Sequence, residues 1–324
     1  LAKFQQDYPN VEVIINIVED DSAFIVAYAA DNSPDIWMVG DYSIRGDINN
    51  GRLYPLNDYL TEEQLNDMYP LYRERVSKDG NVYAWMANTD ARIIYYNKDI
   101  FEKAGLDRDY KPTTWEEWLE VMEKTNHVMG EDQYAYAFPA YLDINTPLMW
   151  DALVRQCGGV VVEDATGKIM LGSDATVKAA EFYRDIIAKG YVSDAVFGMD
   201  DTIRKKEFAM GNLAMMMGGS WELAQLRADS TMDVDNVVGW FPIPYPEDGQ
   251  PATIGGFWNL AISSKTQHPD EAWALISYLY SEEYLKNNVI ETNAVPTRIS
   301  YLTLPEVQND PFNKAVSEYA SQYG

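Results

Sequence analysis

A glycine pair followed by serine and tryptophan is the most distinctive candidate for chemistry in this sequence. Residues 215–226 read MMMGGSWELAQL, an apolar run that leads through Gly218, Gly219, Ser220 and Trp221 into a helix-like pattern. Amide groups at a helix N-terminus attract anions, and a serine at a sharp turn is a candidate nucleophile. The spacing fits neither role, because a phosphate loop needs wider glycine spacing and a lysine, and a nucleophile elbow needs spaced glycines and a histidine partner.

The same motif is consistent with a binding corner. We expect Gly218 and Gly219 to turn the backbone, Ser220 to cap the following helix, and Trp221 to offer its ring to a ligand. The plainer alternative is that Trp221 packs into the core.

Histidine and cysteine are too scarce for several kinds of active site. Cys157 is the single cysteine, which excludes an internal disulfide and a cysteine zinc cluster. His127 and His268 lie far apart in polar segments, which disfavours a histidine triad or a metal site. We therefore assign no catalytic residue, metal or cofactor. A carboxylate pair for glycoside hydrolysis remains an alternative, since acidic residues are abundant.

The charge and the aromatic content favour a neutral, hydroxyl-rich ligand. Lysine and arginine total 25 against 51 acidic residues, a net charge of −26 that disfavours nucleic acid and anionic membranes as partners. Aromatic residues make up 13% of the chain. Aromatic faces cover the C–H patches of a sugar ring, while carboxylates accept hydrogen bonds from its hydroxyls.

The elements that must position these residues alternate between strand and helix. Residues 11–18 are rich in β-branched side chains and predict a buried strand. Residues 22–30 predict a helix and residues 33–40 a second strand, and together these form the unit of a parallel sheet. Further strands are predicted at 91–96 and 213–217.

Capping signals place several helices. Thr61 and Gln64 form a capping box for a helix through about Val76, and Thr114 and Glu117 form a second one. A further helix is expected to end at Gly190, and another to start at Pro269. The residues of the first of these two helices that should face a core are Val177, Ala180, Tyr183, Ile186 and Ile187.

The length of 324 residues favours two domains. Three prolines between residues 242 and 246 suit an extended segment that crosses between domains better than a strand inside a sheet. The overall pattern is α/β.

Several segments, in order over nearly the whole chain, resemble the extracellular solute-binding proteins of ABC sugar importers, the group that includes maltose-binding protein. They are SPDIWMVGD (33–41), GRLYPLNDYL (51–60), IIYYNKDIFEKAGL (93–106), PTTWEEW (112–118), FAMGNLAMMMGGSW (208–221), IGGFWNLAIS (254–263), PDEAWALISYL (269–279) and AVPTR (294–298). The resemblance implies a type II periplasmic-binding-protein-like fold, with two α/β lobes and the ligand in the cleft between them.

The resemblance also implies lobe boundaries. The N-terminal lobe would comprise residues 1–96 and 252–291, and the C-terminal lobe residues 97–251 and 292–324. The hinge crossings would lie near residues 95–99, 240–251 and 292–298.

Site residues follow from the resemblance position by position. Trp221 corresponds to an aromatic residue that stacks on the sugar, and Asp41 and Asp90 to acidic groups that accept hydroxyl hydrogen bonds. The other ligand-binding positions that it implies are Gly256, Phe257, Trp258, Arg298, Tyr141 and Trp150. For Trp258 and Trp150 packing is the alternative role, and for Arg298 it is a structural salt bridge.

The implied function is substrate capture for a carbohydrate importer, without catalysis. The expected partners are a mono- or oligosaccharide and the membrane subunits of an ABC permease, with the protein as a monomer outside the cytoplasm, anchored by a lipid or free. Leu1 opens on the end of a helix, so we expect the N-terminus to be trimmed. A polyamine or other small solute on the same fold, and a glycoside hydrolase, are the alternatives.

Overall fold

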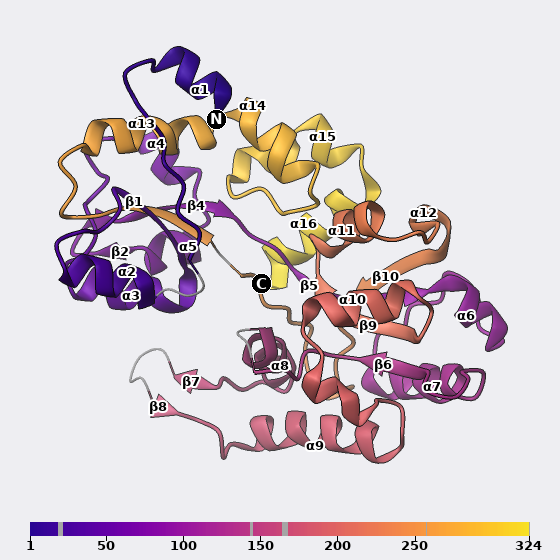
Figure 1. Ribbon diagram of the computed structural model, residues 1–324. Helices are drawn as coiled ribbons and strands as arrows, with labels where there is room; N and C mark the ends of the chain where they lie inside the picture. The colour runs from indigo at the N-terminus through magenta and orange to yellow at the C-terminus, as the bar shows by residue number, and fades with distance from the viewer. Residues whose placement is uncertain (19–21, 143–144, 164–167, 257, 324) are drawn as a thin grey trace. The chain divides into compact units, whose positions relative to one another are not determined.

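The chain folds into two compact units, each assembled from separate stretches of sequence. The computed structural model describes residues 1–18, 22–142, 145–163, 168–256 and 258–323 (Figure 1). Unit 1 comprises Leu1–Thr89 and Gly256–Lys314, and unit 2 comprises Asp90–Gly255 and Ala315–Gly324. The chain therefore passes between the units at 89–90, 255–256 and 314–315.

These boundaries differ from the expected lobes in three places. Residues 90–96 belong to unit 2, because strand β5 (Arg92–Asn97) pairs on both sides with strands of that unit. Residues 252–255 belong to unit 2 as well. Residues 292–314 belong to unit 1, where Val295 forms a bridge with Thr89 and Arg298 forms one with Met68.

Unit 1 is built around a three-stranded antiparallel sheet of order β1-β11-β4. Its core includes Phe24, Trp37, Tyr72 and Trp85, all buried. Its elements are α1 (Ala2–Asp7), α2 (Ser22–Ala29), β1 (Ile36–Gly40), α3 (Asp41–Asn49), α4 (Glu62–Asn66), α5 (Pro70–Arg75), β2 (Ser77–Lys78), β3 (Asn81–Val82), β4 (Ala84–Asn88), β11 (Trp258–Ile262), α13 (Pro269–Leu279), α14 (Glu282–Leu285), a π-helical turn (Lys286–Ile290), a 3-10 turn (Ile299–Thr303) and α15 (Pro305–Gln308).

The predicted first strand is wrong. Residues 11–18 belong to no strand, and Ile17 is 95% exposed. The β-branched run supplies strand propensity, but a strand also needs a neighbour with which to exchange hydrogen bonds. Among the described residues β1 pairs with β11 alone, and antiparallel, so the expected parallel strand–helix–strand unit is not formed here.

Unit 2 holds a four-stranded sheet of order β10-β5-β9-β6. The two central strands, β5 and β9, are buried along their whole length, and their antiparallel register places Arg92 opposite Gly219. The elements of this unit are β5, α6 (Lys98–Lys103), α7 (Trp115–Asn126), β6 (Tyr134–Ala137), α8 (Asn145–Gln156), β7 (Val162–Glu163), β8 (Lys168–Ile169), α9 (Asp174–Ala188), a 3-10 turn (Asp194–Gly198), α10 (Asp201–Ala209), β9 (Leu213–Gly219), α11 (Glu222–Asp229), α12 (Val234–Val237) and β10 (Val238–Pro242); α16 (Pro311–Tyr323) begins in unit 1 and ends in unit 2.

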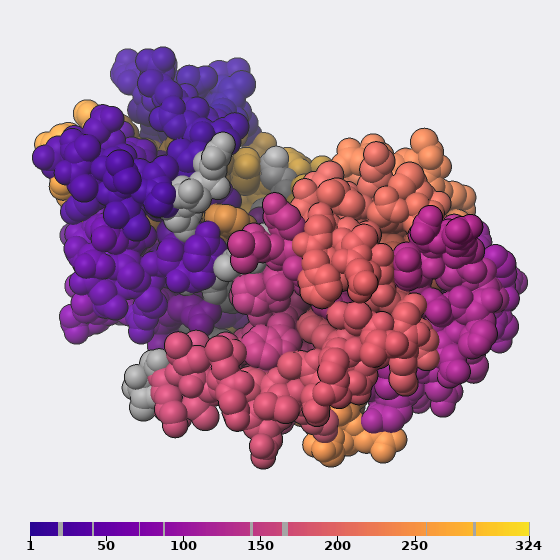
Figure 2. Space-filling model, turned by 60° about the horizontal axis from the view of Figure 1, so that its bottom comes forward, coloured from indigo at the N-terminus to yellow at the C-terminus, as the bar shows by residue number. Residues whose placement is uncertain are grey.

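The two predicted capping boxes are confirmed, whereas helix lengths and faces are less accurate. Both predicted capping boxes form, at Thr61 and at Thr114. The helix predicted through Val76 is instead two helices, since Pro70 starts α5. Helix α9 lies at the surface of unit 2 (Figure 2). The residues that it buries are Thr176, Ala179, Phe182 and Ile186, so only Ile186 of the predicted face is buried, and Val177 is exposed.

The proline-rich segment contributes to a sheet. Residues 238–242 form the edge strand β10, which pairs with β5, and the chain leaves unit 2 only after Gly255. An edge strand tolerates Pro242 at its end, because a missing amide there removes no ladder hydrogen bond that the sheet requires. Pro244 and Pro246 belong to no strand, so the prediction that this segment lies outside a sheet is wrong only for its start, at Pro242. The predicted crossing between the units at this segment is also wrong.

Candidate functional site

Trp221 lies at the junction between strand β9 and helix α11. It occupies the position before the first helical residue, with φ −66° and ψ −18°, and its side chain is half-buried. Ser220 does not cap the helix, contrary to expectation, because α11 starts at Glu222 and Ser220 therefore lies one residue before the capping position. Its hydroxyl is buried without a hydrogen-bond partner among the described residues.

The two glycines serve close packing and do not turn the chain. Gly218 and Gly219 are the last residues of β9, paired with Ile93 and Arg92 across the sheet. A Cβ atom at Gly219 would lie 1.9 Å from the Trp221 ring, and one at Gly218 would lie 2.5 Å from the Glu222 carboxylate. Glycine is required here because side chains from the next three residues fold back over the strand. The predicted turning role is therefore wrong.

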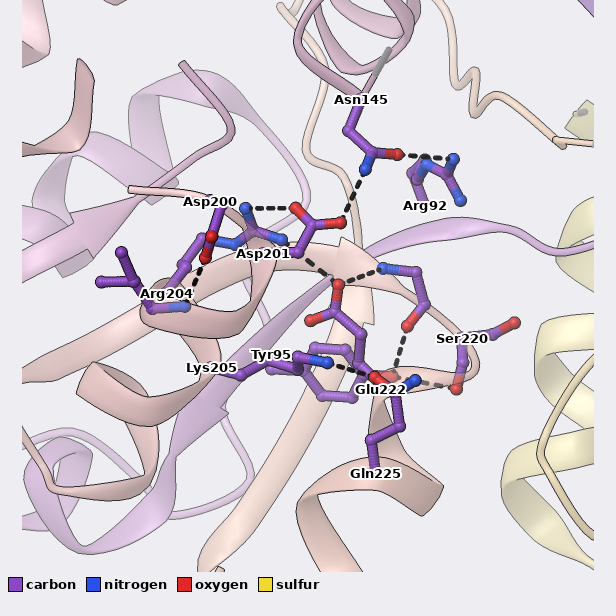
Figure 3. A network of polar contacts seen from close by, with 12 residues as sticks. Arg92, Tyr95, Asn145, Asp200, Asp201, Arg204, Lys205, Ser220, Glu222 and Gln225 are labelled. Atoms are coloured by element: carbon purple, nitrogen blue, oxygen red, sulfur yellow. Dashed lines mark hydrogen bonds and ion pairs between the residues drawn. The ribbon is translucent and has the colours of Figure 1, made fainter. Parts of the chain in front are cut away.

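Arg92 supports the indole ring of Trp221 from the neighbouring strand. Its guanidinium carbon lies 4.6 Å from the centre of the Trp221 ring, within the range of a cation–π contact. The same guanidinium forms an ion pair with Asp90 and donates a hydrogen bond from Nη2 to Asn145 Oδ1 at 3.3 Å (Figure 3). The Arg92 side chain is only 3% exposed, so Trp221, Arg92 and Asp90 form one packed cluster.

A buried ion pair lies beneath this cluster. Arg204 on α10 and Glu222 on α11 are both 0% exposed and lie 3.2 Å apart, between Nη2 and Oε1 (Figure 3). Burial raises the pKa of the Glu222 carboxyl above its usual value, and the positive charge of Arg204 opposes that rise. Asp201 lies 2.9 Å from Arg204 and accepts a hydrogen bond from Asn145 Nδ2 at 2.6 Å.

Tyr95 secures the end of strand β9. Its buried hydroxyl lies 2.9 Å from the carbonyl oxygen of Gly219 and 3.1 Å from that of Ser220 (Figure 3). The backbone amide of Gly219 points to Glu222 Oε1, at 3.4 Å. The backbone that leads into Trp221 is thus held on both sides.

The structure brings together some of the residues predicted from sequence. Asp90 and Trp221 are joined through Arg92. Tyr141 is exposed ahead of α8, and Trp150 lies half-buried on that helix. Both belong to unit 2, but no contact of theirs with the cluster is described.

The remaining predicted residues belong to unit 1. Asp41 begins α3, but its side chain lies outside the described residues, as does all of Phe257. Gly256 is the first residue of the return to unit 1, and the exposed Trp258 opens β11, opposite Gly40.

Arg298 has structural partners. Its Nε lies 2.6 Å from Asp67 Oδ2, and its Nη1 donates to the Tyr301 hydroxyl at 2.8 Å. These contacts are those of a structural salt bridge, which was the alternative role for this residue.

Sequence reasoning missed Arg92 in the cluster and all of the polar residues linked to it. It did not single out Arg92, Asn145, Asp201, Arg204 or Glu222. One signal was available, because Arg92 precedes the apolar and aromatic run IIYY of a buried strand, and a buried arginine requires partners. Among the described residues, no group of three or more histidine, cysteine, aspartate and glutamate side chains could hold a metal ion.

We predict that Gly219→Ala displaces the ring of Trp221. The new methyl group would overlap the indole, so the ring must leave Arg92, and the tryptophan fluorescence spectrum should shift. Gly198→Ala is the matched control, since no atom lies within 4 Å of its Cβ position. An unchanged spectrum in Gly219→Ala would contradict the packing described here.

Comparisons with known proteins define the class. The family model for bacterial extracellular solute-binding proteins matches residues 1–286. A solute-binding protein of an ABC transporter from Thermotoga lettingae, solved with α-D-tagatose, has a TM-score of 0.87 at 25% identity and covers 98% of this chain and 81% of its own. Maltose-bound MalE3 of T. maritima has a TM-score of 0.86 at 24% identity, and the match covers 98% of this chain and 83% of MalE3.

The fold is that of the two-lobed α/β periplasmic solute-binding proteins. The chain belongs to the bacterial extracellular solute-binding protein family, whose members are binding proteins. A maltotriose-binding protein of Pyrococcus abyssi is 26% identical over 309 residues, 94% of this chain and 63% of the relative. An sn-glycerol-3-phosphate-binding periplasmic protein of Pectobacterium atrosepticum is 24% identical over 266 residues, which are 78% of this chain and 59% of that relative.

The chain thus spans less than two thirds of the length of these two relatives. In the part of the chain that the structure describes, no helix is long and apolar enough to cross a membrane.

Proposed function

We propose that this protein captures a mono- or oligosaccharide and delivers it to the membrane subunits of an ABC importer. The observation that carries the proposal is the half-buried indole of Trp221 at the end of β9, which packs over Gly219 and against Arg92, the ion-pair partner of Asp90. An aromatic ring in a fixed position suits the C–H face of a sugar, and a carboxylate beside it suits a hydroxyl. The names of the maltotriose- and maltose-binding relatives point to the same ligand class.

The other predicted residues complete the proposal. Asp41, Gly256, Phe257 and Trp258 would contribute contacts from unit 1, and Tyr141 and Trp150 from unit 2. Arg298 is a weaker candidate, because Asp67 and Tyr301 already engage its guanidinium.

The mechanism of the proposed function needs no bond to be made or broken. Solute binding would favour one arrangement of the two units, by hinge motion at the three crossings, and the permease would recognise that arrangement. The protein would work outside the cytoplasm as a monomer, with or without a lipid anchor. Glycoside hydrolysis is the alternative that product analysis tests.

The first experiment is a fluorescence titration with a panel of neutral sugars, with glycerol 3-phosphate, spermidine and amino acids as further arms. We expect a saturable change in tryptophan emission with one class of neutral sugar, and recovery of the sugar unaltered. Saturation by spermidine or by glycerol 3-phosphate, with no response to sugars, would overturn the carbohydrate assignment. Release of smaller sugars during incubation would overturn the assignment as a pure binding protein.

A further inference from the structure

We propose that Asp201 and Asn145 are positioning residues for solute binding, because they close a circuit of contacts that holds Trp221 by both its backbone and its ring. Figure 3 shows the part of this circuit that runs from Arg92 through Asn145, Asp201 and Arg204 to Glu222. The inference rests on the proposed role of Trp221 as the platform for the solute.

One half of the circuit holds the backbone of Trp221. Glu222, the next residue, extends under β9 to meet Arg204, and the missing side chain of Gly218 leaves room for its carboxylate. Arg204 then lies 2.9 Å from Asp201. Because Glu222 is the first residue of α11, these contacts fix the start of the helix and with it the position of Trp221.

The other half holds the ring. Asp201 accepts a hydrogen bond from Asn145 Nδ2 at 2.6 Å, and Asn145 Oδ1 accepts one from Arg92 at 3.3 Å. Arg92 in turn lies against the indole of Trp221. The path therefore returns to the residue from which it started, after passing through the first residues of α8, α10 and β5.

Asp201 is the member that the two halves share. Its side chain is 26% exposed, whereas Arg204 and Glu222 are fully buried, so Asp201 can be changed with less damage to the core. Without it, Arg92 and Arg204 are no longer linked through Asn145. In Asp201→Ala the Trp221 ring would therefore be more mobile before the solute binds. Binding must then order the ring, and the entropy lost in that ordering lowers the affinity for the solute.

The test is a double-mutant cycle with the sugar found in the titration. We expect Asp201→Ala to weaken binding about tenfold in the parent protein and to have little further effect in the Trp221→Ala background, because the two residues act through each other. Glu181→Ala is the control, since Glu181 pairs with Arg184 at the same i,i+3 spacing on α9. An equal loss in both backgrounds, or no loss in the parent, would overturn the proposal.

A measurement without solute separates this proposal from the proposed function. Fluorine NMR of protein labelled with fluorotryptophan reports the environment and mobility of Trp221, whose signal is assigned by its loss in Trp221→Phe. We expect Asp201→Ala to shift or narrow that signal and Glu181→Ala to leave it unchanged. A protein that binds no sugar but shows this change retains the positioning role and loses the proposed function; an unchanged signal in Asp201→Ala overturns the positioning role.

Discussion

Trp221→Ala is expected to weaken sugar binding about 100-fold, or ~3 kcal/mol, which is the scale found for a central aromatic contact. The variant should fold, because Trp221 is half-buried and the strand and helix on either side keep their own contacts. The affected contact is the stacking surface that Arg92 supports from the neighbouring strand. Calorimetric titration of the parent and the variant with the same sugar measures the effect.

Trp240→Ala is the matched control for this experiment. Trp240 is also a half-buried tryptophan of unit 2, and Lys111 lies 5.1 Å from the centre of its ring, so it shares the chemical features of Trp221 without its place at the end of β9. Its removal should leave the affinity for sugar unchanged. If Trp221→Ala bound as tightly as the parent, the assignment of the platform would be wrong.

Arg204→Met is expected to lower the free energy of unfolding by about 3–5 kcal/mol, because it leaves the buried carboxylate of Glu222 without its opposite charge. Chemical denaturation followed by circular dichroism measures the loss. Arg184→Met is the control, since Arg184 forms only exposed ion pairs on α9 and should change stability by about 0.5 kcal/mol or less. A loss in Arg204→Met no larger than in this control would contradict the description of a tightly coupled buried pair.

The loss in the free energy of unfolding caused by Arg204→Met should depend on pH. Burial raises the pKa of Glu222 in the folded protein, and removing Arg204 removes the charge that opposes that rise. The folded variant then binds a proton that the unfolded chain releases above its ordinary value of 4.5, so stability falls as pH increases beyond that value. We expect a larger loss at about pH 8 than at about pH 5, and replacing Glu222 by leucine in the same protein should remove this dependence. Equal losses at both pH values would show that charge is not the cause.

Local signals in the sequence predicted much of the helical structure. The capping boxes at Thr61 and Thr114 formed as expected, because both partners lie within one turn and depend on nothing else in the fold. The strand predicted at 11–18 did not form, because pairing depends on a neighbour that the residues themselves do not specify. The first lobe boundary was displaced for the same reason, since the pairing partners of β5 decide to which unit it belongs.

The candidate site could also be predicted only in part from the sequence. Trp221 and Asp90 were identified because their motifs match a family pattern at those positions. Arg92 was missed, although its charge and its place in an apolar strand are visible, because its partner Gly219 comes from a distant part of the chain. The glycine pair was identified, but its role was misjudged, since only the packed side chains of Trp221 and Glu222 explain why a Cβ atom is excluded.

The sequence by itself determined the class of protein, the acidic surface and the residue expected to serve as the platform, because these depend on composition and on short ordered motifs. The tertiary structure alone decided what holds that platform: the cross-strand pair of Arg92 and Gly219, the buried pair of Arg204 and Glu222, and the link through Asn145 and Asp201. The physical reason is that a buried charge is stable only with partners at defined distances, and those partners come from strands and helices that the chain brings together only on folding.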